Sequence, residues 1–223
     1  MTDSPGSDPL IFPLGHYLGA SRSDARSEPD FYVVRIGWRT VKLHGDQQLT
    51  VWALAHGLPL GEADDLPAWT RGAVEGAARS GGIARPSDTV RELLDQELLV
   101  AVDPDSPEVI NFARACRARS LLVGQGNTPQ DPLRYGISPS EALASVQVDS
   151  FTYELWKWAH ACDNLWHACQ ILAAAGDPDD PDQVDPDRVL DRCLRSIQTL
   201  LAIGAAYLDE AREGSVEPAS ATR

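Results

Sequence analysis

The stretch Y-E-L-W-K-W-A-H-A-C, residues 153–162, decides how this sequence is best interpreted, because a fainter copy of it lies upstream. The copy is T-V-W-A-L-A-H-G, residues 50–57. When Trp52 is placed over Trp156, an offset of 156 − 52 = 104, the histidines that follow also coincide. A pattern that recurs at one spacing indicates a repeated structural unit. We therefore expect these tryptophans to pack inside a duplicated fold, and we do not interpret the stretch as an active centre.

Segments upstream of the two stretches correspond in the same order. T-V-K-L, residues 40–43, matches S-V-Q-V, residues 145–148, at an offset of 105. Further upstream, residues 30–37 resemble residues 131–137. Short alternating segments of this kind, bounded by turn residues, predict a β-hairpin at the start of each copy.

Three helical patterns follow the predicted hairpin in each copy. They cover residues 46–57, 66–81 and 87–102 in the first copy and 149–162, 164–176 and 185–203 in the second. The last of these helices has a strong start, because Asp185 is a good N-cap and Pro186 suits the first helical position. The corresponding helix of the first copy runs into L-V-A-V, residues 99–102, which could be a strand.

The correspondence predicts two tandem units with a short segment between them. We place unit 1 at residues 10–105, unit 2 at residues 120–212 and a connector at residues 106–119. The connector is either a helix, since Pro107 suits a first turn, or the return strand of a hairpin. Residues 1–9 and 213–223 are expected to be flexible tails.

Two strands followed by three helices, the last leading into an apolar strand-like segment, resembles a winged-helix arrangement. The pattern-level motifs are V-W-A-L-A-H-G, residues 51–57, and V-R-E-L-L-D-Q-E-L-L-V, residues 90–100. They resemble both the winged helix-turn-helix DNA-binding domains and the PqqD-like peptide-recognition domains. The resemblance implies an α+β fold of two winged-helix-like units related by a pseudo-two-fold axis. It also implies binding rather than catalysis.

Charge and hydropathy restrict the classes of partner. The net charge is −14 and the sequence pI is about 4.6, so the chain repels nucleic-acid phosphates unless its cations gather on one face. The longest apolar runs fall well short of the roughly 20 residues of a membrane span. No signal peptide is recognised, and we expect a cytoplasmic protein whose four cysteines stay reduced.

Arginines are the most informative candidate binding residues. Arg188, Arg192 and Arg195 fall at i, i+4 and i+7 of the last predicted helix and share one face. Such a stripe suits phosphate contacts or an acidic peptide. The alternative is a solvated face, on which Asp191 pairs with Arg195.

Arg91 and Trp38 complete the set of predicted partner-binding residues. Arg91 occupies the matching helix of unit 1, but carboxylates surround it at Asp88, Glu92, Asp95 and Glu97. That environment argues against DNA contact by unit 1. Trp38 lies in the hairpin turn, where we expect it to be half-buried, whereas an exposed Trp38 would anchor a partner.

Metal and catalytic chemistry are the less favoured interpretations. His160, Cys162, His167 and Cys169 have metal-ligand side chains, but ligands seven residues apart on one helix lie about 10.5 Å apart along its axis. A chain reversal at residues 163–164 would bring them together, so this alternative stays open. No recognised catalytic motif is present. We therefore expect no enzyme, no cofactor and no metal.

The sequence thus predicts a non-catalytic regulator or adaptor that binds a protein or peptide partner. Its ligand would add a strand to a sheet edge and contact the arginines of the third helix. The alternative is a DNA-binding transcriptional regulator of the winged helix-turn-helix type. A homodimer is possible in either case, and no membrane partner is expected.

Overall fold

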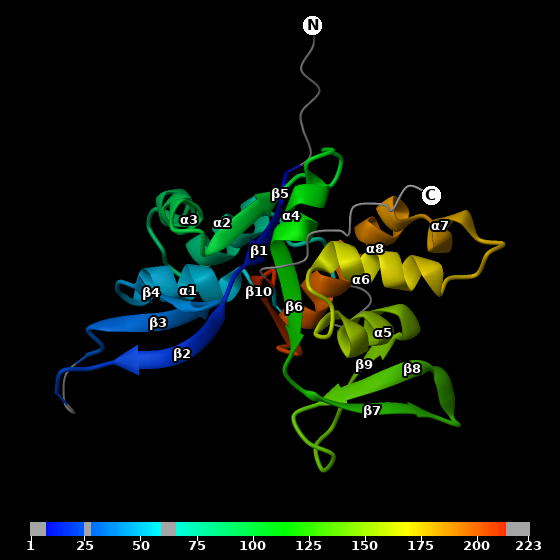
Figure 1. Cartoon of the computed structure of the whole chain (residues 1–223). Coiled ribbons are helices and arrows are strands. Elements are labelled where there is room, and N and C mark those ends of the chain that lie inside the picture. Colours follow the sequence, from blue (N-terminus) through cyan, green and yellow to red (C-terminus); the bar gives the residue numbers. More distant parts are fainter. Residues whose placement is uncertain (1–7, 25–27, 59–65, 213–223) are drawn as a thin grey trace, which may run out of the picture.

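The computed structural model describes residues 8–24, 28–58 and 66–212, and the chain is an α+β protein in two halves (Figure 1). The first half contains β1 (Leu10–Pro13), β2 (His16–Ser21), β3 (Phe31–Ile36), β4 (Arg39–Leu43), α1 (Asp46–Leu54), α2 (Arg71–Ser80), α3 (Pro86–Asp95) and β5 (Leu99–Val102). Helix α4 (Val109–Ala115) follows. The second half contains β6 (Cys116–Ser120), β7 (Val123–Thr128), β8 (Asp131–Ser138), β9 (Val146–Asp149), α5 (Ser150–Ala159), α6 (Leu165–Ala174), α7 (Pro181–Val184), α8 (Pro186–Ala202) and β10 (Ala206–Glu210). The element order of the first half is repeated in the second, with α7 added.

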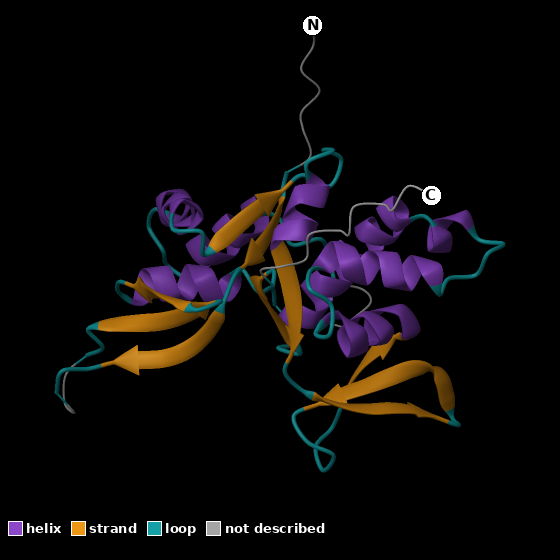
Figure 2. Ribbon diagram, in the orientation of Figure 1, coloured by secondary structure: helices purple, strands orange, loops and turns teal. Residues whose placement is uncertain are grey.

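The first and last strands of each half pair with each other and lie in the middle of the molecule (Figure 2). Strand β1 is antiparallel to β5, with Pro13 opposite Leu99. Strand β6 is antiparallel to β10, with Ser120 opposite Ala206. Both pairs have the same register, since 120 − 13 and 206 − 99 both equal 107. The duplication therefore extends to the strand pairing.

Each half also contains a three-stranded antiparallel sheet, β2-β3-β4 or β7-β8-β9. The predicted hairpin is the second and third strand of this sheet, so the predicted unit of a hairpin and three helices was too small. The first strand was missed because a bulge at Gly19, repeated at Gly126, interrupts its alternation. Both glycines have positive φ angles, 117° and 70°, which L-residues with a side chain rarely adopt.

The predicted helices are present, and local capping explains where they begin. The Asp149 side chain accepts a hydrogen bond from the Thr152 N–H at the start of α5. Asp185 caps α8 and Pro186 is its first residue, as predicted. Segment 99–102 is the strand β5.

The third helix of each half ends in the same way. After α8, Gly204 has a φ angle of 68°, and after α3 the equivalent residue, Glu97, has a φ angle of 57°. A left-handed residue at this position satisfies the last helical carbonyls. Leu98 and Ala205 then donate their N–H groups to Leu93 and Leu200, five residues back. In the second half a glycine adopts this left-handed conformation without strain. In the first half Glu97 adopts it, and its side chain makes the conformation strained.

Both tryptophans of the sequence repeat lie in the core. Trp52 is 5% exposed and Trp156 is 9% exposed. The indole of Trp52 donates to the carbonyl of Leu14 at 3.2 Å, and that of Trp156 donates to the carbonyl of Ala205 at 3.0 Å. Each tryptophan thus joins the first helix of its half to the central strands, and the expectation of packing residues is confirmed.

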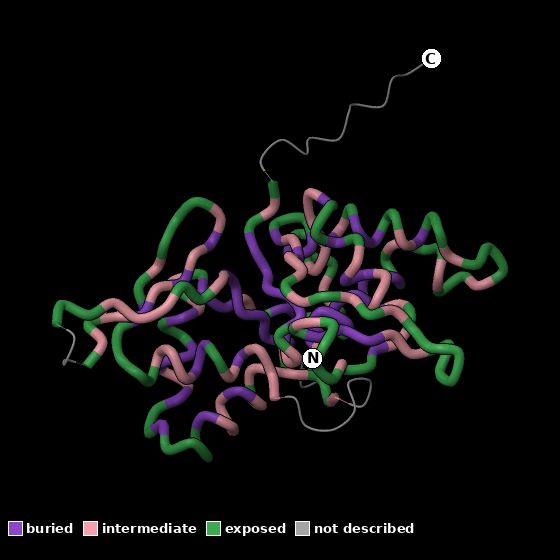
Figure 3. The backbone as a smooth tube through the Cα atoms, turned by 90° about the horizontal axis from the view of Figure 1, so that it is seen from below, coloured by how far each residue is buried: buried purple, intermediate pink, exposed green. Residues whose placement is uncertain are grey.

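The two halves contact each other through the central strands and the β3–β4 turn. The N–H of Gly15 donates to the carbonyl of Leu208 at 2.7 Å, and the N–H of Gly37 donates to the carboxylate of Asp209 at 2.6 Å. Figure 3 shows buried backbone running through this middle region and exposed segments at the far ends.

The segment predicted as a connector contains both a helix and a strand. Its first part forms α4, which agrees with the helical alternative, but residues 116–120 form β6 and belong to the second half. Of the predicted N-terminal tail, Asp8 accepts hydrogen bonds from Thr70 and Gly72 at the start of α2. Residues 1–7 and the predicted tail 213–223 lie outside the described residues. Within the described ranges, no helix combines the length and the apolar character that crossing a membrane requires.

Candidate partner-binding cleft

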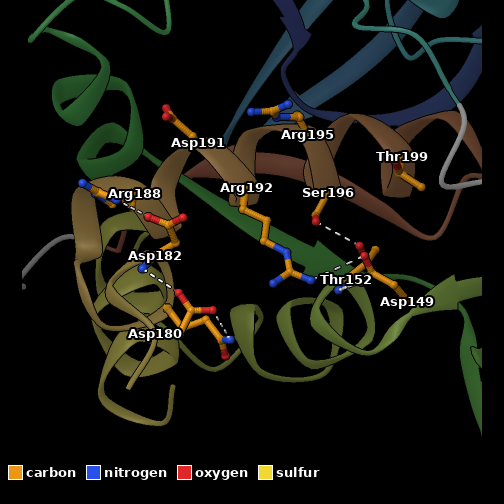
Figure 4. A pocket seen from close by; sticks show the side chains of 11 residues that line it. Asp149, Thr152, Asp180, Asp182, Arg188, Asp191, Arg192, Arg195, Ser196 and Thr199 are labelled. Atoms are coloured by element: carbon orange, nitrogen blue, oxygen red, sulfur yellow. Dashed lines mark hydrogen bonds and ion pairs between the residues drawn. The ribbon is translucent and has the colours of Figure 1, made fainter. Parts of the chain in front are cut away.

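The arginine stripe of α8 lines a cleft of about 700 Å³ between α5, α7 and α8 (Figure 4). All three predicted arginines of α8 border it, together with Asp149, Asp180, Asp182 and Asp191. A cleft with both signs of charge therefore occupies the surface for which the sequence predicted a cationic stripe.

Two of the three arginines contact carboxylates inside the cleft. Arg188 forms ion pairs with Asp182 and with Asp185, and the hydrogen bond from Arg188 to Asp182 raises the pKa of this arginine. Arg192 lies 3.7 Å from a carboxylate oxygen of Asp149. These side chains are 41% to 72% exposed, so the pairs contribute little to stability and can exchange for a ligand.

Arg195 points away from Arg192 in Figure 4 and is exposed. Within the described part of the chain, no ion pair joins it to Asp191, the partner that the solvated-face alternative proposed. The three positions, at i, i+4 and i+7, share one face of the helix, so the side chains of Arg192 and Arg195 diverge beyond the backbone.

The floor of the cleft is polar and buried. The hydroxyl groups of Thr152 and Ser196 lie 2.9 Å apart and connect α5 to α8. Thr152 is 4% exposed and Ser196 is 5% exposed. A buried hydroxyl pair of this kind fixes the spacing of the two helices, because each group would lose its partner if they separated.

An apolar groove of about 370 Å³ adjoins the cleft between α5, α6 and the segment around α7. Phe151, Trp158, Ile171 and Leu172 line it, and Trp158 is 51% exposed. The guanidinium of Arg192 lies 4.0 Å from the centre of the Phe151 ring. Arg192, Asp182 and Gln183 line both cavities, so the cleft and the groove form one continuous surface.

Sequence reasoning missed the groove because it treated the tryptophans of residues 153–162 alike. Trp156 is buried, but Trp158 lies two residues further along the helix and faces outward. Its indole N–H donates to Glu154, also on α5. The signal in the sequence was the period of the buried stripe, Leu155 and Ala159, which leaves position 158 outside it.

The first half has a smaller counterpart of the cleft, about 510 Å³, between the start of α1 and α3. Arg85 takes the place of Arg192, since 192 − 85 = 107, and Asp46, Asp88 and Glu92 also line this cavity. Arg91 pairs with Asp88 at 3.3 Å on the outside of α3. The counterpart is acidic, and Arg91 lies in a different half from the arginines of α8.

Trp38 is fully exposed at the turn between β3 and β4. The expectation of a half-buried residue is therefore wrong, and the side chain has the exposure that the alternative, a partner anchor, requires. Its neighbours explain the exposure: Gly37 lies against Glu210 of the other half and Arg39 pairs with that same glutamate at 3.1 Å. These contacts hold the turn, while the indole of Trp38 is exposed and does not line the cleft.

The cysteines of the sequence are buried, and the histidine of the first repeat, His56, lies at the end of its helix. All four cysteines are buried, and burial raises the pKa of the Cys116 thiol to about 12 and that of Cys162 above its usual value. His56, at the end of α1, contacts the carbonyl of Trp52 through Nδ1 at 3.0 Å. In the described ranges, no group of three or more histidine, cysteine or acidic side chains is arranged to hold a metal ion.

Comparison with known proteins gives no relative: no family model matches the chain, and neither a curated protein nor a solved structure does.

Proposed function

We propose that this chain is a non-catalytic regulatory or adaptor protein of the cytoplasm that binds a protein or peptide partner through two winged-helix-like units. The observation that carries the proposal is the continuous surface of the second half, in which a charged cleft and an apolar groove share Arg192, Asp182 and Gln183. An aromatic anchor beside an arginine is the usual composition of a binding hot spot. Trp158 and Arg192 provide that pair.

The chemistry of the surface indicates the kind of peptide that it fits. The groove would take an apolar or aromatic side chain against Trp158 and Ile171. The cleft would take charged residues of either sign, because Arg192 and Asp149 are 3.7 Å apart and both partly exposed. An amphipathic segment with an apolar residue next to charged residues satisfies both requirements.

The sequence also predicts that a partner binds by adding a strand to the edge of a sheet. The β-bulges of β2 and β7 disfavour this mode of binding at two sheet edges. Strands β2 and β7 are edge strands of their sheets, and both are interrupted at the equivalent glycines, Gly19 and Gly126. A bulge disturbs the regular row of N–H and C=O groups that an added strand needs. The helical surface is therefore the stronger site for a partner.

A DNA-binding regulator is the second candidate, and Arg195 favours it. This arginine is exposed on the third helix, at the position of a recognition helix in the winged-helix interpretation. Against it, Arg188 and Arg192 pair with carboxylates, and Asp180 and Asp191 add negative charge beside them. A phosphate backbone that approaches α8 would meet the carboxylates of Asp149, Asp180, Asp182 and Asp191, and this repulsion weakens the DNA-binding candidate.

The experiment that tests the proposal is selection of short random peptides on the purified full chain, followed by affinity measurement on variants. Trp158→Ala and Arg192→Glu should each weaken a selected peptide by about 30-fold or more, the loss typical of a hot-spot residue. Arg85→Glu, at the matching position of the first half, is the control and should leave the affinity within about twofold. Selected peptides that bind both cleft variants as tightly as the wild type would refute the proposed surface.

The DNA alternative is tested in parallel by fluorescence anisotropy with a labelled duplex of about 20 base pairs. Binding at about 25 mM salt that disappears by about 200 mM salt, and that Arg195→Ala weakens, supports the DNA candidate. No change in anisotropy at the lower salt concentration removes it.

A further inference from the structure

A separate pocket of about 440 Å³ lies between β6, the C-terminal half of α5 and the residues that follow β10. Its ionisable lining residues are Arg119, Lys157, His160 and Arg212. These residues come from three segments that are far apart in the sequence and that only the pairing of β6 with β10 brings together. The pocket shares no residue with the cleft or the groove.

The pocket differs from its surroundings in charge, because no acidic side chain of the described residues lines it. The cleft, the groove and the counterpart in the first half each include at least one acidic side chain. The chain as a whole has a net charge of −14. Arg119, Lys157 and Arg212 therefore gather positive charge around one cavity, although Lys157 and Arg212 each also pair with a carboxylate outside its lining.

Two of the three cations, Arg119 and Lys157, can donate to a ligand. Among the described residues, Arg119 has no ion-pair partner. Lys157 pairs with Glu154 at 2.6 Å, but both side chains are about 40% exposed, so the pair can exchange. Arg212 pairs with Asp163 at 3.7 Å, and a ligand would have to share or replace this contact.

Two other polar groups of the pocket already have partners. The hydroxyl of Ser120 donates to the carbonyl of Trp156, and the indole of Trp156 donates to Ala205. Recognition in this pocket therefore depends on the cations, and the indole ring provides an apolar wall.

The repeat shows that these cations are specific to the second half. In the first half, Phe12 takes the place of Arg119, since 119 − 12 = 107, and Ala53 takes the place of Lys157, since 157 − 53 = 104. Phe12 is fully buried and packs against Phe112, with ring centres 4.9 Å apart. One half thus fills this position with an apolar side chain, whereas the other leaves a cavity lined by cations.

We propose that this pocket binds an oxyanion, the phosphate or carboxylate group of a ligand larger than a simple ion. The guanidinium of Arg119 and the ammonium of Lys157 donate to the oxyanion, and Arg212 closes the open side. The volume lies in the range of small-molecule sites, so the rest of the ligand packs against Trp156. This site goes beyond the partner-binding surface and does not depend on it.

The test is a titration of the full-length protein with small anionic probes at constant ionic strength. Two-dimensional ¹H–¹⁵N NMR spectra monitor each step of the titration. Inorganic phosphate and succinate, both close to dianionic at about pH 7.5, are the two probes, and sodium chloride is the control titrant. Either probe should shift the Trp156 indole signal and the amides of Lys157 and His160 in a saturable way. The tighter probe identifies whether phosphate or carboxylate is the preferred group.

Variants decide whether the pocket is responsible. Arg119→Gln, Lys157→Gln and Arg212→Gln should each weaken probe binding by about tenfold or more, because each removes a charge-assisted contact. Lys157 and Arg212 are exposed, so their variants remain informative if Arg119→Gln fails to fold. Arg91→Gln is the matched control and should bind as the wild type does.

Two results overturn the proposal: shifts that stay linear up to about 50 mM probe, which indicate no specific site, and saturable shifts unchanged in both exposed variants. Arg192→Glu should leave the titration unaltered, which separates a failure of this site from a failure of the partner-binding surface.

Discussion

Removal of the Asp209 carboxylate is the sharpest test of how the two halves are held together. Asp209 is 3% exposed. One of its oxygens accepts hydrogen bonds from the N–H of Gly37 at 2.6 Å and from the N–H of Glu210 at 3.1 Å. The other lies 3.7 Å from the guanidinium of Arg117, whose side chain is 14% exposed. The carboxylate therefore joins β10 both to the β3–β4 turn and to β6.

The expected cost follows from what the substitution leaves without a partner. Asp209→Ala deprives two backbone donors of their acceptor and Arg117 of its counter-charge. Removing one partner of a buried ion pair typically costs about 3–5 kcal/mol, and we expect a loss in this range. Asp209→Asn keeps an oxygen for the N–H of Gly37 but loses the charge, so about 1–3 kcal/mol is expected, the contribution of a hydrogen bond to a charged group.

Urea unfolding monitored by tryptophan fluorescence measures both losses as a shift of the midpoint at constant slope. Glu210→Gln is the matched control, because the Glu210 side chain is 48% exposed and its pair with Arg39 should contribute less than about 1 kcal/mol. An Asp209→Ala protein that unfolds within about 1 kcal/mol of the wild type would refute the reasoning.

Three further predictions concern single residues. Glu97→Gly should stabilise the protein by about 0.5–1 kcal/mol in the same assay, because it relieves a positive φ angle of 57° and loses only an exposed ion pair with Arg39; a loss of stability would contradict this. Burial lowers the pKa of His56 below its ordinary value of 6.5, so the unfolded chain binds the proton more readily than the folded one. The free energy of unfolding should therefore fall as the pH drops below about 6.5, and His56→Gln should show a smaller fall, measured by urea unfolding at a series of pH values. Because burial raises the pKa of Cys116 to about 12, this thiol should react with a thiol reagent at about pH 8 only after unfolding, which absorbance monitors.

Much of the local structure could be predicted because its causes are local. The start of α8 depends on Asp185 and Pro186, which act on their own helix turn. The duplication was visible through Trp52 and Trp156, since both copies need a large buried side chain with an indole donor at the same place. Equivalent residues of α1 and α5 lie 104 positions apart, whereas equivalent residues of the central strands lie 107 positions apart. The offset changes because the loops between the elements differ in length in the two halves.

The candidate sites could not be predicted to the same extent. The arginines of α8 were found from their spacing, but their carboxylate partners were not, because Asp149 and Asp182 come from a strand end and a short helix elsewhere in the chain. Trp38 was expected to be half-buried and is exposed. The period of the buried stripe places Trp158 outside it, but whether another element covers Trp158 depends on where α6 lies.

The sequence by itself determined the repeated pattern of strands and helices and most of the points at which the helices begin, because capping, periodicity and turn chemistry act over a few residues. Only the tertiary structure decided that β6 pairs with β10 across some 90 residues and that β1 pairs with β5. Those pairings place Arg119, Lys157 and Arg212 around one cavity and Asp209 between the two halves. Long-range pairing depends on the summed burial of the whole chain, so no short segment contains the information that specifies it.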